Sequence, residues 1–441
     1  MKPLDGDDLP QSHKLKTEGY ETNKLVHLRQ AIALISDHAD PAAEIGVEEA
    51  GGQNVYVRQL GETLASLGWQ VDMFTRKVDP KTPAIVQHSP HCRTIRLVAG
   101  PEQFIPRDEI FQFMPQFVQA FEAFRLKEAI HYPLVHTNYW LSGWIGLQLK
   151  KIHKIQLVHT YHSLGVVKYK VVPNLSPIAD TRLSVEKQIL EQADCVIANS
   201  PQEQEYLRTL VSQKGHIKVI PCGTDNYLRT VSKEQARAKL GLDPAEEIVL
   251  CVARFDPRKG IETAVRACAK SRAKTIGNLR LVIVGGSCPG RIDEQERKRI
   301  EQIVQEVGLA ERTVFAGRVD HNVLPFYYSA ADVCVIPSYY EPFGLVAIEA
   351  MACGTPVVAS NVGGLKFTVL PEQTGLLAPP QDTVAFATAI DKILLDKQFS
   401  KQLSTQASVL VRERFSLVSI VSQLSNLYQY LIAQSIERCH C

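Results

Sequence analysis

Short apolar runs of strand length alternate with longer segments of helical periodicity from residue 25 onward. This alternation is typical of doubly wound parallel sheets, in which helices connect successive strands. The first series predicts six strands, at residues 31–35, 70–74, 94–98, 134–136, 155–159 and 196–198. The second series predicts five, at residues 248–253, 279–284, 314–316, 333–336 and 356–359. The pattern therefore predicts an α/β protein with two Rossmann-like, doubly wound domains facing across a cleft.

Breaks in the pattern suggest the domain boundaries. Residues 1–24 are polar and predict a flexible N-terminal lead-in. Proline and glycine interrupt the pattern at residues 221–225, so we place the hinge there, with domains over residues 25–222 and 223–416. Residues 417–436 have helical periodicity and close the chain. Two similar domains in tandem leave a cleft that suits the joining of two substrates.

Composition argues against several classes of partner. The 441 residues include 49 basic and 47 acidic side chains, so the formal net charge of +2 gives no reason to expect nucleic acid. No apolar run reaches the roughly 20 residues that span a bilayer, and the N-terminus lacks a secretory signal. We therefore expect a cytoplasmic protein with no membrane partner. Ten scattered cysteines without paired metal spacing favour reduced thiols.

A polar loop, a helix and a buried strand follow the fourth predicted strand of the second series. They carry two carboxylates, Glu341 and Glu349, and Glu341 comes at the carboxyl end of that strand, where open α/β sheets bind ligands. Gly344 permits close approach of the backbone, and the amides of Phe343, Gly344 and Leu345 suit a phosphate or sugar oxygen. The alternative is that Glu341 is only a loop residue and Glu349 only a charge on the helix surface.

A pair of glycines, Gly51 and Gly52, follows the first predicted strand and opens a helix. The chain must turn tightly there, beside any bound ligand. The spacing lacks the G-x-G-x-x-G pattern of dinucleotide sites, which counts against an oxidoreductase. The alternative is that the glycines only form a turn.

Basic side chains follow two further predicted strands. His162 and Lys168 come after the fifth strand of the first series, where both can reach an anion. Arg254 and Lys259 follow the first strand of the second series and precede a helix, so both cations and the helix amides converge on one anion site. The alternatives are a structural histidine, a solvated lysine and a basic loop with solvated ends.

Three other residues are candidates for contact with an acceptor. Arg182 suits bidentate contact with a phosphate, but it lies four residues before Glu186, so the residues alone favour a helix-surface salt bridge. Arg107 follows a Gly-Pro segment and carries a similar charge. Tyr139 is either an acceptor contact or a core residue.

The string Glu-Pro-Phe-Gly-Leu at 341–345, continued by Glu-Ala-Met-Ala-Cys-Gly-Thr-Pro-Val-Val-Ala at 349–359, resembles the E-x7-E signature of retaining, nucleotide-sugar-dependent glycosyltransferases. His-Ser-Leu-Gly-Val-Val-Lys at 162–168 looks like the corresponding stretch of sucrose-phosphate synthases. The motifs match in order from about residue 25, and they are most similar to the short, cyanobacterial type of that family, which has no attached phosphatase domain.

The resemblance implies the GT-B architecture, with a last helix at 417–441 that joins the first domain. It implies transfer of glucose from UDP-glucose to fructose 6-phosphate with retention of the α configuration, giving sucrose 6-phosphate and UDP. Both substrates are small molecules, and no cofactor is expected. Outside the polar lead-in, which contains Asp5-Gly-Asp7, the chain has no D-x-D cluster, so no metal is expected either, and the protein must itself supply positive charge to the leaving diphosphate.

The resemblance also assigns roles on the donor side. Arg254 and Lys259 would neutralise the diphosphate, Glu349 would bind the ribose hydroxyls, and Glu341 with the adjacent amides would hold the glucose. His162 would contact the transferred sugar. It would become the candidate general base if the enzyme inverted instead.

On the acceptor side, Lys168 would contact the phosphate, and the Gly-Gly loop would face both donor phosphate and acceptor. The expected catalytic residues are His162, Arg254, Lys259 and Glu341. The expected donor-binding residues are Gly52, Arg254, Lys259, Glu341, Phe343, Gly344, Leu345 and Glu349, and the expected acceptor-binding residues are Gly51, Gln53, Asn54, Arg107, Tyr139, Ser163, Lys168 and Arg182.

Four alternatives remain. The same catalyst could use an inositol phosphate, since glycosyltransferases for that acceptor share Gly-Gly-x-Asn-Val-Tyr-Val, present here at 51–57. Free fructose is disfavoured because Lys168, Arg182 and Arg107 suggest an acceptor phosphate. The other two are a sugar-nucleotide epimerase, which would need no acceptor, and a non-catalytic nucleotide-sugar-binding protein. The residues leave the donor base and the oligomeric state open.

Overall fold

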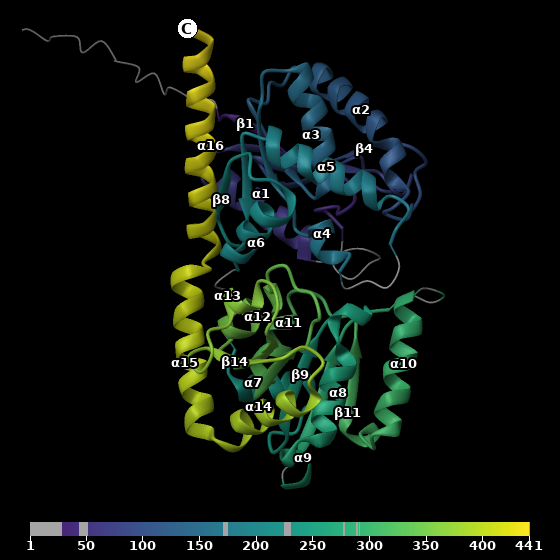
Figure 1. Cartoon of the computed structure of the whole chain (residues 1–441), viewed down its shortest axis with the longest axis vertical. Coiled ribbons are helices and arrows are strands. Elements are labelled where there is room, and N and C mark those ends of the chain that lie inside the picture. Colours follow the sequence, from purple (N-terminus) through teal and green to yellow (C-terminus); the bar gives the residue numbers. More distant parts are fainter. Residues whose placement is uncertain are drawn as a thin grey trace, which may run out of the picture.

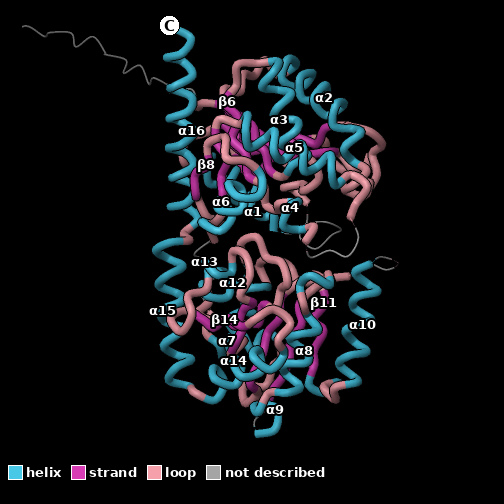
Figure 2. Tube along the Cα trace, in the orientation of Figure 1, coloured by secondary structure: helices cyan, strands magenta, loops and turns pink. Residues whose placement is uncertain are grey.

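The computed structural model describes residues 29–43, 52–170, 175–224, 231–276, 278–287, 290 and 292–440. Within them, the strands form two separate sheets, each with helices on both faces (Figure 1). Figure 2 shows the two sets of strands, one in the upper and one in the lower half of the molecule. The prediction of two Rossmann-like, doubly wound domains is therefore confirmed. Gly51 and the predicted lead-in at 1–24 lie outside the described residues.

The first sheet has the order β3-β4-β2-β1-β5-β6-β7-β8. Its strands are β1 (Ala31–Ile35), β2 (Gln70–Arg76), β3 (Ile85–Ser89), β4 (Cys92–Leu97), β5 (Leu134–Asn138), β6 (Gln156–Thr160), β7 (Cys195–Ala198) and β8 (Ile217–Val219). Neighbours pair in parallel except β3, which runs antiparallel to β4. The prediction of six strands here was wrong, because β3 is a half-exposed edge strand of mixed polarity and β8 has only three residues.

Helices cover both faces of this sheet. They are α1 (Gly52–Ser66), α2 (Met114–Lys127), α3 (Trp140–Ile152), α4 (Gly165–Lys168), α5 (Ala179–Gln192) and α6 (Pro201–Tyr206), with short turns η1 (Ile110–Phe113) and η2 (Leu207–Val211). The alternation of β1 explains the two layers. Ile32 and Leu34 belong to the core that includes α1, while Ala33 and Ile35 belong to the core that includes α2, α3 and α5.

The second sheet has the order β11-β10-β9-β12-β13-β14, all parallel. Its strands are β9 (Glu247–Val252), β10 (Leu279–Val284), β11 (Thr313–Gly317), β12 (Val333–Ile336), β13 (Val357–Ser360) and β14 (Gly375–Ala378). The prediction of five strands was wrong by one. It missed β14, a four-residue edge strand that begins with glycine.

Nine α-helices are described around the second sheet. They are α7 (Lys233–Leu240), α8 (Ile261–Lys270), α9 (Arg272–Ile276), α10 (Ile292–Glu306), α11 (Leu324–Ala330), α12 (Leu345–Ala352), α13 (Leu365–Thr368), α14 (Thr383–Leu395) and α15 (Lys397–Arg414), with turns η4 (Pro257–Lys259) and η5 (Ala310–Arg312). One face of the sheet packs against α8, α10 and α14, and the other against α11, α12 and α15.

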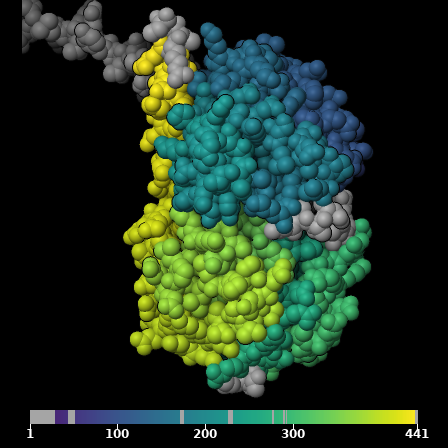
Figure 3. Space-filling model, viewed as in Figure 1, coloured from purple at the N-terminus to yellow at the C-terminus, as the bar shows by residue number. Residues whose placement is uncertain are grey.

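The last helix, α16 (Leu417–His440), returns to the first domain and runs alongside it (Figure 1). Figure 3 shows the C-terminal helices along one side of both domains. Trp69 Nε1–H donates to Ser425 Oγ at 2.9 Å, and Tyr428 contacts the buried His136. Apolar residues of α16 join a core that also includes α1, so this helix ties the end of the chain to the first domain. None of the described helices has the length and apolar content that crossing a bilayer requires.

The packing of α16 can be tested by truncating one buried side chain. Leu424 is 1% exposed inside this core, so Leu424→Ala should leave a cavity and lower the free energy of unfolding by about 2–5 kcal/mol. The control is Val418→Ala on the exposed face of the same helix, which should change it by less than about 0.5 kcal/mol. Denaturant unfolding measures both. Equal effects would mean that α16 does not pack as described.

Candidate active site

A cavity of about 280 Å³ lies between the carboxyl ends of the two sheets. Residues that follow β1, β5, β6 and β7 line it from the first domain, and residues that follow β9 and β12 line it from the second. The predicted site residues that line it are Gly52, Gln53, Asn54, Arg107, Tyr139, His162, Ser163, Lys168, Arg254, Lys259, Glu341, Phe343, Gly344 and Leu345. Parallel strands explain this convergence, since their carboxyl ends meet at one edge.

Two residues at this edge have unusual backbone conformations. Tyr139 follows β5 with φ of +77°, and His162 follows β6 with φ of +57°. Both values are uncommon for residues with a side chain, and such strain is concentrated at functional sites. The Tyr139 N–H donates to Thr160 O at 2.9 Å, which helps to hold the turn. The strain turns both side chains into the cavity rather than along the sheet.

His162 is oriented by Asn138. The Asn138 side-chain amide donates to Ile35 O at 3.3 Å, so its Oδ1 faces His162 Nε2 at 2.9 Å and must accept a hydrogen bond from the Nε2–H. This fixes the tautomer and leaves Nδ1 as an acceptor for a sugar hydroxyl. Burial, with the charges of His136 and His38, lowers the pKa of His162 to about 3. A group with that pKa is neutral at pH 7 and is a poor general base.

The donor side contains an ion pair. Lys259 Nζ lies 2.6 Å from Glu341 Oε2, although the two residues come from loops after different strands. Gly260, which follows Lys259, has φ of +64°, and a Cβ atom there would lie 2.1 Å from Pro337 O. Glycine is therefore required where the two loops touch. Arg254 lines the cavity beside this pair, as predicted for an anion site.

The loop that carries Glu341, called the donor loop below, packs against Gly363 and Gly364 of the loop after β13. We call this contact the clamp. Gly364 N–H donates to Glu341 O at 3.0 Å. A Cβ atom on Gly363 would lie 2.2 Å from Glu341 O, and one on Gly364 would lie 2.4 Å from Phe343 Cα. The two glycines thus let the loop after β13 pack directly on the backbone of the donor loop, which fixes the position of the Phe343 and Gly344 amides.

Cations gather on the acceptor side. Lys168 ends α4 and lines the cavity with Arg107 and Arg258. Burial lowers the pKa of Lys168 to about 8, helped by the charges of Arg182, Arg258 and Arg107 and opposed by Asp108. Like charges that are held close together and partly desolvated favour binding of an anion.

Arg182 does not line this cavity. Its guanidinium donates to Glu186 Oε1 at 2.7 Å, to Tyr139 Oη at 3.2 Å and to Ser163 O at 2.7 Å, and its side chain is 2% exposed. The salt bridge to Glu186 that the residues alone favoured is present, but its expected place on the helix surface was wrong, because both side chains are buried. Arg182 lies behind Tyr139 and Ser163 and orients them, and direct contact with an acceptor stays a prediction.

Glu349 also lies outside the lining residues. It accepts a hydrogen bond from Tyr328 Oη at 2.7 Å, and burial raises the pKa of its carboxyl. The eight-residue spacing from Glu341 therefore does not bring both carboxylates to one cavity wall. The ribose contact of Glu349 stays a prediction.

Several lining residues were missed by the sequence analysis, among them His38, Tyr56, Asn199, Arg258 and Tyr340. Arg258 and Tyr340 are neighbours of the predicted Lys259 and Glu341, so their positions were visible in the motifs. What the motifs lack is the direction in which each loop side chain points. Within the described ranges, no three His, Cys, Asp or Glu side chains are grouped as ligands of a metal ion would be.

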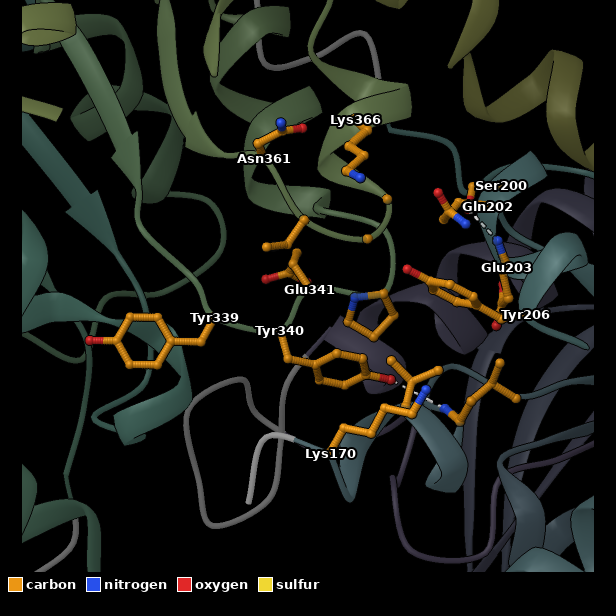
Figure 4. Close-up of a pocket in the computed structure, with 16 residues that line it drawn as sticks. Lys170, Ser200, Gln202, Glu203, Tyr206, Tyr339, Tyr340, Glu341, Asn361 and Lys366 are labelled. Atoms are coloured by element: carbon orange, nitrogen blue, oxygen red, sulfur yellow. Dashed lines mark hydrogen bonds between the residues drawn. The ribbon is translucent and has the colours of Figure 1, made fainter. Parts of the chain in front are cut away.

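A second cavity, also of about 280 Å³, lies behind the donor loop (Figure 4). It shares Tyr340, Glu341 and Pro342 with the first cavity, so this segment is the partition between them. Figure 4 shows the Tyr340 ring reaching across to the first domain, where its hydroxyl accepts the Leu164 N–H at 3.2 Å. The position of the donor loop therefore depends on a contact between the domains.

Two family models match the chain. Residues 50–226 match Glycosyltransferase Family 4, and residues 232–409 match the group 1 glycosyl transferases. D-inositol 3-phosphate glycosyltransferase from Corynebacterium efficiens is 35% identical over 90% of this chain and 94% of that protein. The chain belongs to the GT-B glycosyltransferases. It is an enzyme of the hexosyltransferase type.

Solved structures of other glycosyltransferases are similar to this one. The sucrose-phosphate synthase of Thermosynechococcus elongatus is 57% identical, with a TM-score of 0.87, over 92% of this chain and 100% of that chain. HepE from Anabaena, solved with UDP and glucose, has a TM-score of 0.71 at 22% identity over 90% of this chain and 99% of that one. The second match supports the fold alone, while the first confirms the resemblance to sucrose-phosphate synthases.

The clamp behind the donor loop of this glycosyltransferase generates a prediction. In Gly364→Ala the new methyl group would collide with the backbone of Pro342 and Phe343, so the loop with Glu341 must shift. Since a misplacement of about 1 Å can cost about 100-fold, kcat/KM for sugar transfer should fall by roughly that factor. Steady-state kinetics measures the loss, and the thermal unfolding midpoint shows whether the fold survives. Full activity in a stable variant would contradict the clamp.

Proposed function

We propose that this enzyme transfers glucose from UDP-glucose to fructose 6-phosphate and releases sucrose 6-phosphate and UDP. The observation that carries the proposal is the group of cations on the acceptor side, Lys168, Arg107 and Arg258, which suits a phosphate on the acceptor. The 57% identity to a sucrose-phosphate synthase over 92% of the chain supports the choice of acceptor.

On the donor side, the proposal assigns the diphosphate to Arg254 and Lys259. Lys259 lies 2.6 Å from Glu341, so it can turn toward a bound diphosphate while Glu341 receives the glucose hydroxyls. Charge that develops on the leaving diphosphate would be stabilised by cations that are already in place. The proposal includes no metal and no cofactor.

The transfer itself is proposed to retain the α configuration. The C1–O bond to UDP breaks, a C1–O bond to the acceptor hydroxyl forms on the same face, and the hydroxyl proton passes to a donor phosphate oxygen. His162, neutral and with Nδ1 as an acceptor, holds a sugar hydroxyl and does not remove this proton.

An inositol phosphate is the second candidate acceptor. It is favoured by the curated relatives, which are D-inositol 3-phosphate glycosyltransferases with about 35% identity. The acceptor-side cations suit either phosphate. Free fructose and the epimerase reaction use no acceptor phosphate and leave this group of cations without a role.

A product assay tests the proposal. The purified protein is incubated with UDP-glucose and, separately, fructose 6-phosphate, fructose, an inositol phosphate and water, and the products are followed by NMR. We expect an α-linked sucrose phosphate in the first reaction alone. Product only with the inositol phosphate would overturn the choice of fructose 6-phosphate as the acceptor. Isomerisation of UDP-glucose in water alone would favour an epimerase. Parallel reactions with ADP-glucose and GDP-glucose test the donor base.

Removing the Lys168 charge should weaken acceptor use specifically. Hydrogen bonds to charged groups contribute about 1.5–3 kcal/mol, so Lys168→Met should raise KM for fructose 6-phosphate roughly 10- to 100-fold. The dissociation constant of UDP should stay within about twofold. Lys170→Met is a matched control, because Lys170 lies two residues away and lines the other cavity. If Lys168→Met weakened UDP binding as much as it weakened use of fructose 6-phosphate, Lys168 would not be an acceptor contact.

The low pKa of Lys168 predicts an alkaline limit. Because the amine is charged only below its pKa of about 8, kcat/KM for fructose 6-phosphate should fall as the pH rises through about 8. In Lys168→Arg the charge persists, so the fall should move above pH 10. Initial rates at limiting acceptor and saturating UDP-glucose measure the profile. An unchanged profile in Lys168→Arg would assign the fall to another group.

A further inference from the structure

Arg258 belongs to the second domain, yet it lines the cavity with the cations of the first. Its charge is among those that lower the pKa of Lys168, which places the two groups within electrostatic reach of each other. Arg107 and Lys168 come from the first domain, and all three side chains border one cavity. Like charges from two domains therefore face each other across the cleft.

Arg258 is held firmly in this position. Its Nε donates to both oxygens of Asp256, at 3.0 and 3.2 Å, and its Nη2 also donates to Asp256. Its carbonyl accepts the Tyr339 N–H at 2.7 Å. These bonds use Nε and Nη2. Nη1 has no hydrogen-bond partner among the described residues, so it is available to a ligand. Burial raises the pKa of Asp256, but the hydrogen bonds and charge of Arg258 outweigh this effect, and the pair stays ionised.

Repulsion between the domains becomes attraction when a dianion lies between them. A phosphate can accept hydrogen bonds from several cations at once, and each is stronger where water is excluded. Resting on the proposed function, we propose that Arg258 is the second domain's contact to the acceptor phosphate, so that this phosphate itself holds the two domains in the catalytic arrangement. Phosphorylated acceptors are then preferred because they complete the site, and not only because they bind more tightly.

The loop that carries Arg258 connects the proposed acceptor-phosphate contact to the donor site. Arg258 is followed by Lys259, which pairs with Glu341, so a phosphate bound at Arg258 fixes the backbone from which the diphosphate contact extends. Binding energy from a part of the substrate that does not react would thus appear in kcat as well as in KM. The bonds made and broken are those of the proposed transfer.

The proposal predicts that a separate dianion can replace the acceptor's own phosphate. Free fructose should react slowly, and added phosphite should increase its rate at least tenfold by filling the site between Arg258 and Lys168. In Arg258→Gln, transfer to fructose 6-phosphate should fall roughly 30- to 300-fold, and phosphite activation of the reaction with fructose should disappear. Arg258→Lys should recover part of the activation.

Arg266→Gln is the matched control, since Arg266 pairs with Glu262 on the outer part of α8. It should retain normal rates and normal phosphite activation. UDP binding, measured by calorimetry, should be the same within about twofold in Arg258→Gln and the wild type. Small-angle scattering adds a readout that needs no turnover, because phosphite with UDP should contract the wild type and not Arg258→Gln.

Three results would overturn the inference. The first is phosphite activation of Arg258→Gln as strong as that of the wild type, and the second is no activation of the wild type. The third is an equal loss of transfer rate with fructose and with fructose 6-phosphate in Arg258→Gln, together with weaker UDP binding. This result would place Arg258 at the diphosphate. If the wild type instead uses an inositol phosphate, the proposed function fails by itself, and the same comparison with unphosphorylated inositol still tests Arg258.

Discussion

The active site depends on a chain that passes between the domains twice at the same place. Thr224 N–H donates to Phe415 O at 2.8 Å, and Leu417 N–H donates to Thr224 O at 3.2 Å, so the outgoing and returning segments are hydrogen-bonded side by side. The helix that follows is anchored to the first domain by Trp69. The two crossings therefore join the domains at one place, beside the start of α16.

Most of the fold could be predicted because buried parallel strands leave a strong signal. The predicted strands at 31–35, 279–284 and 333–336 match β1, β10 and β12 residue for residue, since each is an apolar run, interrupted only by Arg280 in β10, that helices cover on both faces. The strands β3 and β14 were missed for the opposite reason. They lie at sheet edges, where half-exposed or short segments need no continuous apolar run, and only the pairing partner makes them strands.

The site was predictable at the level of loops and less so at the level of side-chain direction. Strand ends predict which loops converge, and His162, Lys168 and Glu341 accordingly line one cavity. A motif does not say which way a helical side chain points once its neighbours are packed. Arg182 pairs with Glu186 of its own helix, as the spacing indicated, but the local sequence does not show that this pair is buried behind Tyr139 and Ser163. Glu349 turns toward Tyr328, which comes from a different helix, α11.

One turn sets the distance between the two proposed phosphate sites. Asp256 caps the short turn that contains Arg258 and Lys259, and Gly260 ends it in a left-handed conformation against Pro337 O. The turn has no room for a bulkier residue at its end and is held at its start by the partly exposed ion pair between Arg258 and Asp256. Arg258 and Lys259 are adjacent, so covalent geometry fixes the separation of their Cα atoms. In the proposed arrangement, the acceptor-phosphate contact of Arg258 and the diphosphate contact of Lys259 would therefore both extend from this one turn of the second domain.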